Sequence, residues 1–144
     1  GPEDPSPNRI PINEINKWVK DGDITYSGST SDVRPFIKRC SVFVLPSYHE
    51  GMPRTVLEAM AMGRPILTTD VPGCRDTVIN GKNGWLINKS DEYELADRMI
   101  WFIKNPEEAK QMGKKSYDIA CDKFDVKQVN KNLLDIIKID NLRI

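Results

Sequence analysis

Residues 41–63, SVFVLPSYHEGMPRTVLEAMAMG, pass from an apolar run to a helical pattern within a short stretch of chain. The run SVFVLPS at 41–47 is continuous and apolar, which is typical of a strand buried in a parallel sheet. From Pro53 to Met62 the pattern is helical, and Gly63 is placed to end the helix as its C′ residue. A strand that leads directly into a helix is the repeating unit of parallel α/β proteins. The stretch therefore predicts an α/β fold.

The same alternation of strands and helices continues along the chain as far as residue 105. Strands are expected at 23–28, 41–47, 64–70 and 85–88. Helices are expected at 12–20, 31–40, 53–62, 72–79, 91–105, 106–121 and 125–138. Short apolar strands alternating with helices predict a Rossmann-like parallel sheet that is flanked by helices, and further helices follow it toward the C-terminus.

The length and organisation of the chain predict one domain. Its 144 residues are enough for a single core, and we find no internal repeat and no low-complexity linker. Within this domain we expect a leader at 1–11, an α/β core at 12–105 and C-terminal helices at 106–140.

The composition excludes several classes of function. Hydrophobic residues make up 39% and charged residues 29%, and the net charge is zero, which argues against a nucleic-acid-binding protein that relies on a basic field. The three cysteines are widely spaced and there is one histidine, so a metal site is not expected, and reduced cysteines in a cytosolic protein are the simpler interpretation. No run reaches the roughly 18 apolar residues that suggest a membrane-spanning helix.

Two glutamates, Glu50 and Glu58, lie on either side of the junction between strand and helix. The segment SYHEGMP follows the carboxyl end of a parallel strand, which is where ligands bind in such sheets. It also forms the start of a helix, where free amides and the helix dipole favour an anion, most often phosphate. Gly51 lets the backbone approach a ligand closely because it has no Cβ atom. The alternative is that both glutamates are surface charges stabilised by the dipole, and their spacing alone does not decide between the two.

The position of Glu58 suggests what it would bind. It lies five residues after Pro53, or roughly 7–8 Å along the helix axis. If a diphosphate occupied the N-terminus of the helix, a nucleoside ribose would lie near Glu58, and a carboxylate can accept hydrogen bonds from two vicinal hydroxyls. Glu50 would then lie beside the group that the distal phosphate carries.

The segment HEGMPRTVLEAMAMGRPILTTDVPGCRDTVINGKNGWLI strongly resembles the C-terminal domain of family 4 glycosyltransferases of the GT-B fold. Further blocks match the same family in the same order: DVRPFIKRCSVFVLPS, MGRPILTTDVPGCRD, NGKNGWLI and FDVKQVNKNLLDII. The resemblance covers nearly the whole chain, and it favours the ligand-binding interpretation of the E-x7-E glutamates over surface charges.

The resemblance implies a retaining glycosyltransferase that uses a nucleotide sugar, by family frequency a UDP-sugar. Such enzymes transfer a hexosyl or N-acetylhexosaminyl group to a glycan or a lipid-linked acceptor. Their C-terminal domain binds the donor and their N-terminal domain binds the acceptor. Bacterial polysaccharide biosynthesis in the cytoplasm, or at the inner face of the membrane, is the setting that the family implies. No cofactor and no metal are expected.

The family pattern also assigns roles to individual residues. It makes Glu50 the catalytic residue at the donor sugar, and it makes Glu58 the residue that binds the ribose hydroxyls. The other donor-binding positions are in the intervening segment, where backbone groups meet the sugar and the diphosphate: Gly51, Met52, Pro53, Arg54 and Thr55. The loop at 29–31 would lie near the base.

The chain also departs from the family pattern. Two strand–helix units that open the family's C-terminal domain are not in this sequence, and with them an Arg and a Lys that grip the diphosphate. The N-terminal domain is not in it either. We therefore expect a fragment, a partial nucleotide-sugar-binding domain without activity of its own. Its sheet would have a gap that is closed by rearrangement or by self-association.

Two other interpretations compete with this one. A non-catalytic nucleotide-binding or regulatory module could keep the same pocket. A glycoside hydrolase would use both glutamates across one sugar, with carboxyls about 5–10 Å apart. The position of Glu58 within the helix suits ribose better than it suits that chemistry.

Overall fold

The computed structural model describes residues 9–125, and its contacts group the chain into two compact units, 1–33 and 34–144. In the first unit, helix α1 (Ile12–Asp21) ends at Gly22, which has a left-handed φ of 85° and donates its N–H to the carbonyls of Trp18 and Val19. The helix confirms the one expected at 12–20. The expected boundaries at residues 11 and 105 are not tested by this grouping and stay predictions.

The strand expected at 23–28 is wrong. Residues 24–30 have no regular secondary structure, and the described part of their unit, 9–33, contains no strand with which they could pair. A strand depends on ladder hydrogen bonds to a neighbour, so an alternating pattern forms none where no neighbour is present.

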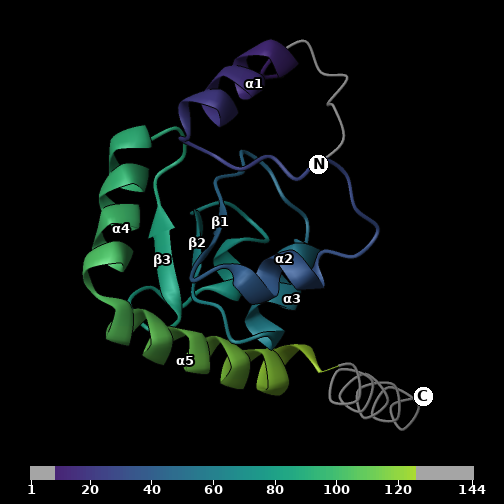
Figure 1. Cartoon of the computed structure of the whole chain (residues 1–144). Helices are drawn as coiled ribbons and strands as arrows, with labels where there is room; N and C mark the ends of the chain where they lie inside the picture. Colours follow the sequence, from purple (N-terminus) through teal and green to yellow (C-terminus); the bar gives the residue numbers. More distant parts are fainter. Residues whose placement is uncertain (1–8, 126–144) are drawn as a thin grey trace, which may run out of the picture. The chain divides into compact units, whose positions relative to one another are not determined.

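The second unit holds the α/β core (Figure 1). Its elements are α2 (Arg34–Arg39), β1 (Phe43–Leu45), α3 (Arg54–Ala61), β2 (Ile66–Thr69), η1 (Arg75–Thr77), β3 (Gly84–Ile87), α4 (Glu92–Lys104) and α5 (Pro106–Phe124). The strands and helices expected in this region are confirmed, except that the segment at 72–79 forms only the short 3-10 turn η1. The helix expected at 125–138 lies outside the described residues.

The three strands form a parallel sheet in the order β1-β2-β3. Phe43 of β1 is in register with Ile66 of β2, and Ile66 is in register with Gly84 of β3. A parallel sheet whose strands alternate with helices confirms the predicted α/β fold.

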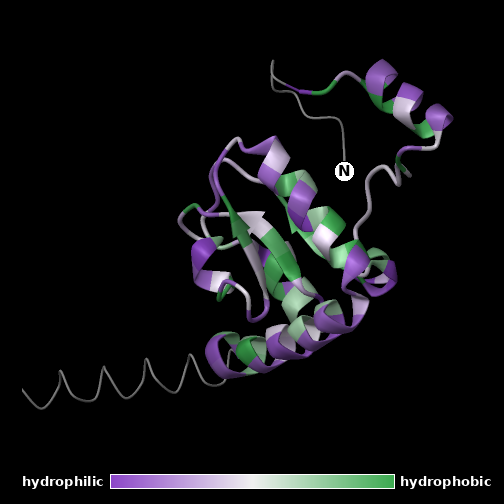
Figure 2. Cartoon of the chain, turned by 90° about the vertical axis from the view of Figure 1, so that its left-hand side faces the viewer, coloured by the Kyte–Doolittle hydropathy of each residue, from purple (hydrophilic) through white to green (hydrophobic). Residues whose placement is uncertain are grey.

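Helices cover both faces of this sheet. On one face, Leu67 and Ile87 form a core cluster with residues of α4 and α5: Phe102, Ala109 and Met112. On the other face, α3 packs against β1 and β2 and buries Val56, Ala59 and Met60. Figure 2 shows the hydrophobic residues concentrated on the strands and a largely hydrophilic α5.

A close backbone contact joins α5 to the turn after α3. A Cβ atom at Gly113 would lie 2.2 Å from the carbonyl oxygen of Gly63, so only glycine fits at that point of α5. Gly63 itself has a φ of 67° and follows the end of α3, as the sequence predicts for a C′ glycine.

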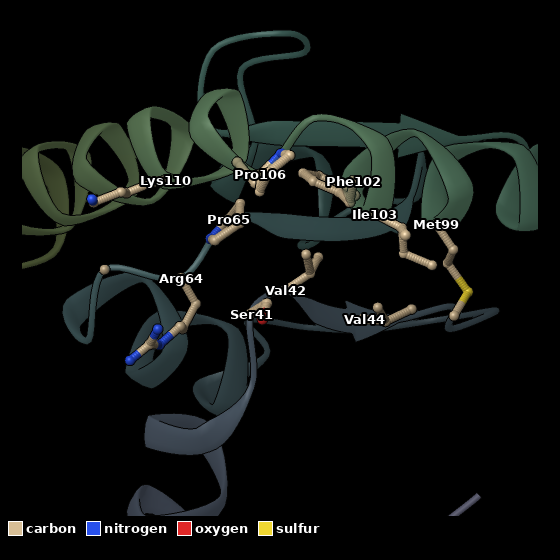
Figure 3. Close-up of a pocket in the computed structure, with 12 residues that line it drawn as sticks. Ser41, Val42, Val44, Arg64, Pro65, Met99, Phe102, Ile103, Pro106 and Lys110 are labelled. Atoms are coloured by element: carbon tan, nitrogen blue, oxygen red, sulfur yellow. The ribbon is translucent and has the colours of Figure 1, made fainter. Parts of the chain in front are cut away.

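Strand β1 is one of the two edge strands of the sheet, because within residues 9–125 it pairs with β2 alone, as β3 does. Beside it is a groove of about 530 Å³ between β1 and the junction of α4 and α5 (Figure 3). Its apolar lining comes from Val42 and Val44 on one side and from Met99, Phe102 and Ile103 on the other. Ile103 is 78% exposed, so apolar surface remains uncovered at this edge.

Candidate functional site

The candidate site lies in the loop between β1 and α3, at the carboxyl edge of the sheet. Strand β1 ends at Leu45, and the next residue, Pro46, has no N–H to continue the ladder. The chain turns there, with the N–H of Ser47 donating to the carbonyl of Leu45 at 3.0 Å. The loop then carries Glu50 to the start of α3.

Two buried threonines of β2 donate side-chain hydrogen bonds to the backbone at the start of this loop. Thr68 Oγ1 donates to the carbonyl of Leu45 at 2.7 Å, and Thr69 Oγ1 donates to the carbonyl of Ser47. Both threonines are at most 3% exposed. The loop therefore begins from a point that the sheet itself fixes.

The loop after β2 packs against the backbone of Glu50 and Gly51. Gly73 has a φ of 82°, and a Cβ atom there would lie 1.6 Å from the carbonyl oxygen of Gly51 and 2.7 Å from that of Glu50. The next residue, Cys74, is fully buried, and burial raises the pKa of its thiol, to which the nearby charge of Glu50 adds. The backbone at Gly73 therefore packs directly against the backbone at Glu50 and Gly51.

The side chain of Glu50 is half-buried and accepts a hydrogen bond from a neighbouring hydroxyl. Ser47 Oγ donates to Glu50 Oε1 at 2.7 Å. The site thus holds a carboxylate of defined orientation where the strand ends.

Helix α3 begins directly after this loop with amides that no side chain caps. Pro53 is its N-cap residue, and there is no acidic residue in the first turn. The carbonyl of Pro53 accepts from Val56 and Leu57, while the first amides of the helix belong to Arg54 and Thr55. Such an end carries partial positive charge, which suits an anionic ligand.

The other predicted site residues surround this helix end. Gly51, Met52 and Arg54 are exposed, Thr55 is half-buried and Pro53 is buried. Glu58 is exposed on α3, four residues after Arg54 and so about 6 Å along the axis. The loop at 29–31 belongs to the first compact unit.

The sequence did not indicate the pocket that adjoins Ser47. Its volume is about 230 Å³, and its walls follow the carboxyl ends of all three strands: Pro46, Ser47, Tyr48, Thr69, Ile87, Asn88, Ser90, Asp91, Glu92 and Leu95. Ser90 has a φ of 64°, a conformation that non-glycine residues rarely adopt and that is frequent near functional sites. The available signal was the polar run NKSDE directly after β3.

Among residues 9–125 there is no group of three or more His, Cys, Asp or Glu side chains placed to hold a metal ion. The same part of the chain has no helix that is both long and apolar enough to cross a membrane.

Comparison with known proteins identifies the family. Residues 13–119 match the family described as glycosyl transferases group 1. The chain belongs to this family. A curated relative, the N,N'-diacetylbacillosaminyl-diphospho-undecaprenol alpha-1,3-N-acetylgalactosaminyltransferase of Campylobacter jejuni, is 32% identical over 62% of the chain and 24% of its own length. The capsular polysaccharide biosynthesis glycosyltransferase CapM of Staphylococcus aureus is 36% identical over 52% of the chain and 20% of its own length.

Two solved structures share the fold. Anabaena Alr3699/HepE, solved in complex with UDP, matches 88% of the chain and 36% of its own with a TM-score of 0.79 and 21% identity. Sucrose-phosphate synthase of Thermosynechococcus elongatus matches the whole chain and 38% of its own, with a TM-score of 0.81 and 23% identity. The predicted GT-B relationship is confirmed. The group 1 chain described here spans about a quarter of the curated relatives' length.

Proposed function

We propose that this chain is the donor-binding part of a retaining glycosyltransferase that uses a UDP-sugar. The observation that carries the proposal is the start of α3, where amides without a side-chain cap lie directly after the Glu50 loop at the carboxyl edge of the sheet. This arrangement suits a diphosphate with a sugar beyond it. Related structures solved with UDP and with UDP-glucose support the choice of donor.

The proposed roles follow from the order of residues along the loop and helix. The amides of Arg54 and Thr55 bind the diphosphate, and Pro53 sets the start of the helix that presents them. The backbone of Gly51 and Met52 meets the sugar hydroxyls. Glu58 accepts hydrogen bonds from the ribose, and Glu50 acts on the reacting sugar.

The acceptor is proposed from the relatives. Their names describe transfer of N-acetylgalactosamine to an undecaprenol-linked sugar and capsular polysaccharide biosynthesis. We propose that the full-length parent transfers a hexosyl or N-acetylhexosaminyl group to a glycan or lipid-linked acceptor in polysaccharide assembly. It would act in the cytoplasm, or at the inner face of the membrane, and its acceptor would bind a separate domain.

The first test is nucleotide binding by calorimetry. We expect this 144-residue chain to bind UDP in the millimolar range or more weakly and the full-length parent to bind it far more tightly. The reason is that the 144 residues do not include the Arg and Lys that the family pattern uses for the diphosphate, and each charge-assisted bond contributes about 1.5–3 kcal/mol. ADP and GDP titrations serve as controls for base selectivity.

Each outcome of this test has a meaning. Micromolar UDP binding to the chain alone would contradict the need for the upstream basic pair. If the full-length parent binds neither UDP nor any other nucleotide, the proposed donor site is wrong. Nucleotide binding without sugar transfer by the parent would favour a non-catalytic nucleotide-binding module instead.

We also propose that the isolated chain self-associates through β1. Within residues 9–125 this strand pairs on one side only, and an apolar groove lined by Val42 and Val44 lies beside it. An edge strand of this kind can pair with a second copy. Sedimentation should show dimers that dissociate on dilution and weaken in an Ile103→Lys variant, because Ile103 lines the same groove and is 78% exposed. The matched control is Lys114→Ala, at an exposed residue of α5. A chain that stays monomeric at high concentration would contradict this.

A further inference from the structure

The loop that carries Glu50 has no regular structure between β1 and α3, so its orientation depends on individual contacts. We infer that Ser47 is a positioning residue, whose hydroxyl holds the Glu50 carboxylate in the orientation in which it meets the donor sugar. This inference rests on the proposed function of Glu50 and adds to it the residue that sets its geometry.

The contact itself is short and directional. Ser47 Oγ lies 2.7 Å from Glu50 Oε1, a distance typical of a hydroxyl that donates to a charged carboxylate. A serine hydroxyl has a single proton, so its donation to Glu50 fixes one rotamer of the hydroxyl. A glutamate side chain is otherwise free to adopt many rotamers, and this bond selects among them.

Ser47 can act in this way because its own backbone is fixed. Its carbonyl accepts a hydrogen bond from the hydroxyl of Thr69, and its N–H donates to the carbonyl of Leu45 at 3.0 Å. Leu45 in turn accepts from Thr68 at 2.7 Å. These contacts connect the buried strand β2, through Ser47, to the Glu50 carboxylate.

The backbone of Glu50 is held separately from its side chain. Gly73 packs against the carbonyls of Glu50 and Gly51, and no side chain larger than hydrogen fits between them. This contact fixes only the main chain, and the hydrogen bond that holds the side chain comes from Ser47.

A simpler role for Ser47 would be to close the turn and stabilise the loop. The two roles differ in what they affect. A positioning residue contributes to an electrostatic arrangement that is used in the transition state, so its loss lowers kcat more than it raises the donor KM. Loss of a turn-closing contact lowers the unfolding temperature and weakens donor binding together with turnover.

The experiment uses the full-length parent and steady-state kinetics with the donor varied. Ser47→Ala should lower kcat by about tenfold with the donor KM changed less than about twofold, the scale expected for one hydrogen bond to a charged group. Ser47→Thr, which keeps a hydroxyl, should restore most of kcat. Thr69→Val should give a smaller loss, because it releases only the carbonyl of Ser47. Ser41→Ala, at an exposed serine before β1, is the matched control.

The double variant separates this inference from the proposed function. In a Glu50→Gln background, Ser47→Ala should cause little further loss, because its effect passes through the Glu50 carboxylate. An equal loss in both backgrounds, or a normal Ser47→Ala variant beside a defective Glu50→Gln, would overturn the inference alone. A normal Glu50→Gln variant would overturn the proposed role of Glu50. If Ser47→Ala fails to fold, the other two variants decide. A lower kcat at unchanged KM in Thr69→Val, with nearly normal kcat in Ser47→Thr, supports the inference, and unchanged kcat in Thr69→Val overturns it.

Discussion

Replacing Glu50 by Gln in the full-length parent is expected to lower kcat by roughly a hundredfold or more. In the proposed reaction, positive charge develops on the sugar ring in the transition state, and a carboxylate beside it would stabilise that charge more than it stabilises the bound donor. Gln has the same shape and can still accept the hydrogen bond of Ser47, so the variant removes the charge with little change in the loop. Initial rates measured over a range of donor concentrations give kcat and KM separately.

The donor KM provides the internal check on this result. It should change far less than kcat, because the contacts proposed for the diphosphate and the ribose do not involve Glu50. The matched control is Glu107→Gln, an exposed glutamate in the first turn of α5. A Glu50→Gln variant that matches this control in both constants would show that Glu50 is a surface charge.

The second large effect is expected at Glu58. A Glu58→Gln variant of the full-length parent should bind the donor about 1–3 kcal/mol more weakly, the range for leaving charged hydrogen-bond partners unmade. The proposed ribose contact would be the same in the ground state and in the transition state, so the loss should appear mainly as a higher donor KM at nearly unchanged kcat. Calorimetric titration with UDP should show the same loss without any turnover.

The two glutamate variants together test the division of roles. A Glu58→Gln variant with lower kcat at unchanged KM, beside a nearly normal Glu50→Gln, would reverse the assignment. If both variants behave like Glu107→Gln, the roles proposed for Glu50 and Glu58 are wrong, and with them the proposed donor site. An intact UDP affinity in Glu58→Gln would reject the ribose contact even if KM rises.

The core of the fold could be predicted because its signals are local. The continuous apolar run at 41–47 contains β1, and Gly63 ends α3 where a left-handed residue is required. The segment at 23–28 also alternates, but a strand needs a neighbour, and the local pattern carries no information about one. At 72–79 the chain forms only a 3-10 turn, since Gly73 adopts a positive φ that does not fit a helix.

The sequence indicated where the candidate site would lie, but it did not indicate the contacts that hold Glu50 in place. The junction of strand and helix, followed by the family resemblance, led to Glu50 and Glu58. The contacts that hold Glu50 join segments far apart in sequence, such as Thr69 to Ser47 and Gly73 to Gly51. Ser90 gave no signal either, because a serine with positive φ looks like any other polar loop residue.

The contact between Gly73 and Gly51 has a consequence for how donor preference could be altered. At this point the two loops meet through main-chain atoms, so exposed side chains nearby can be exchanged without changing the contact itself. A library that varies Tyr48, Met52 and Ser90 while keeping both glycines should therefore retain folded members. Any residue other than glycine at position 73 would separate the loops and remove the shared frame on which such changes depend.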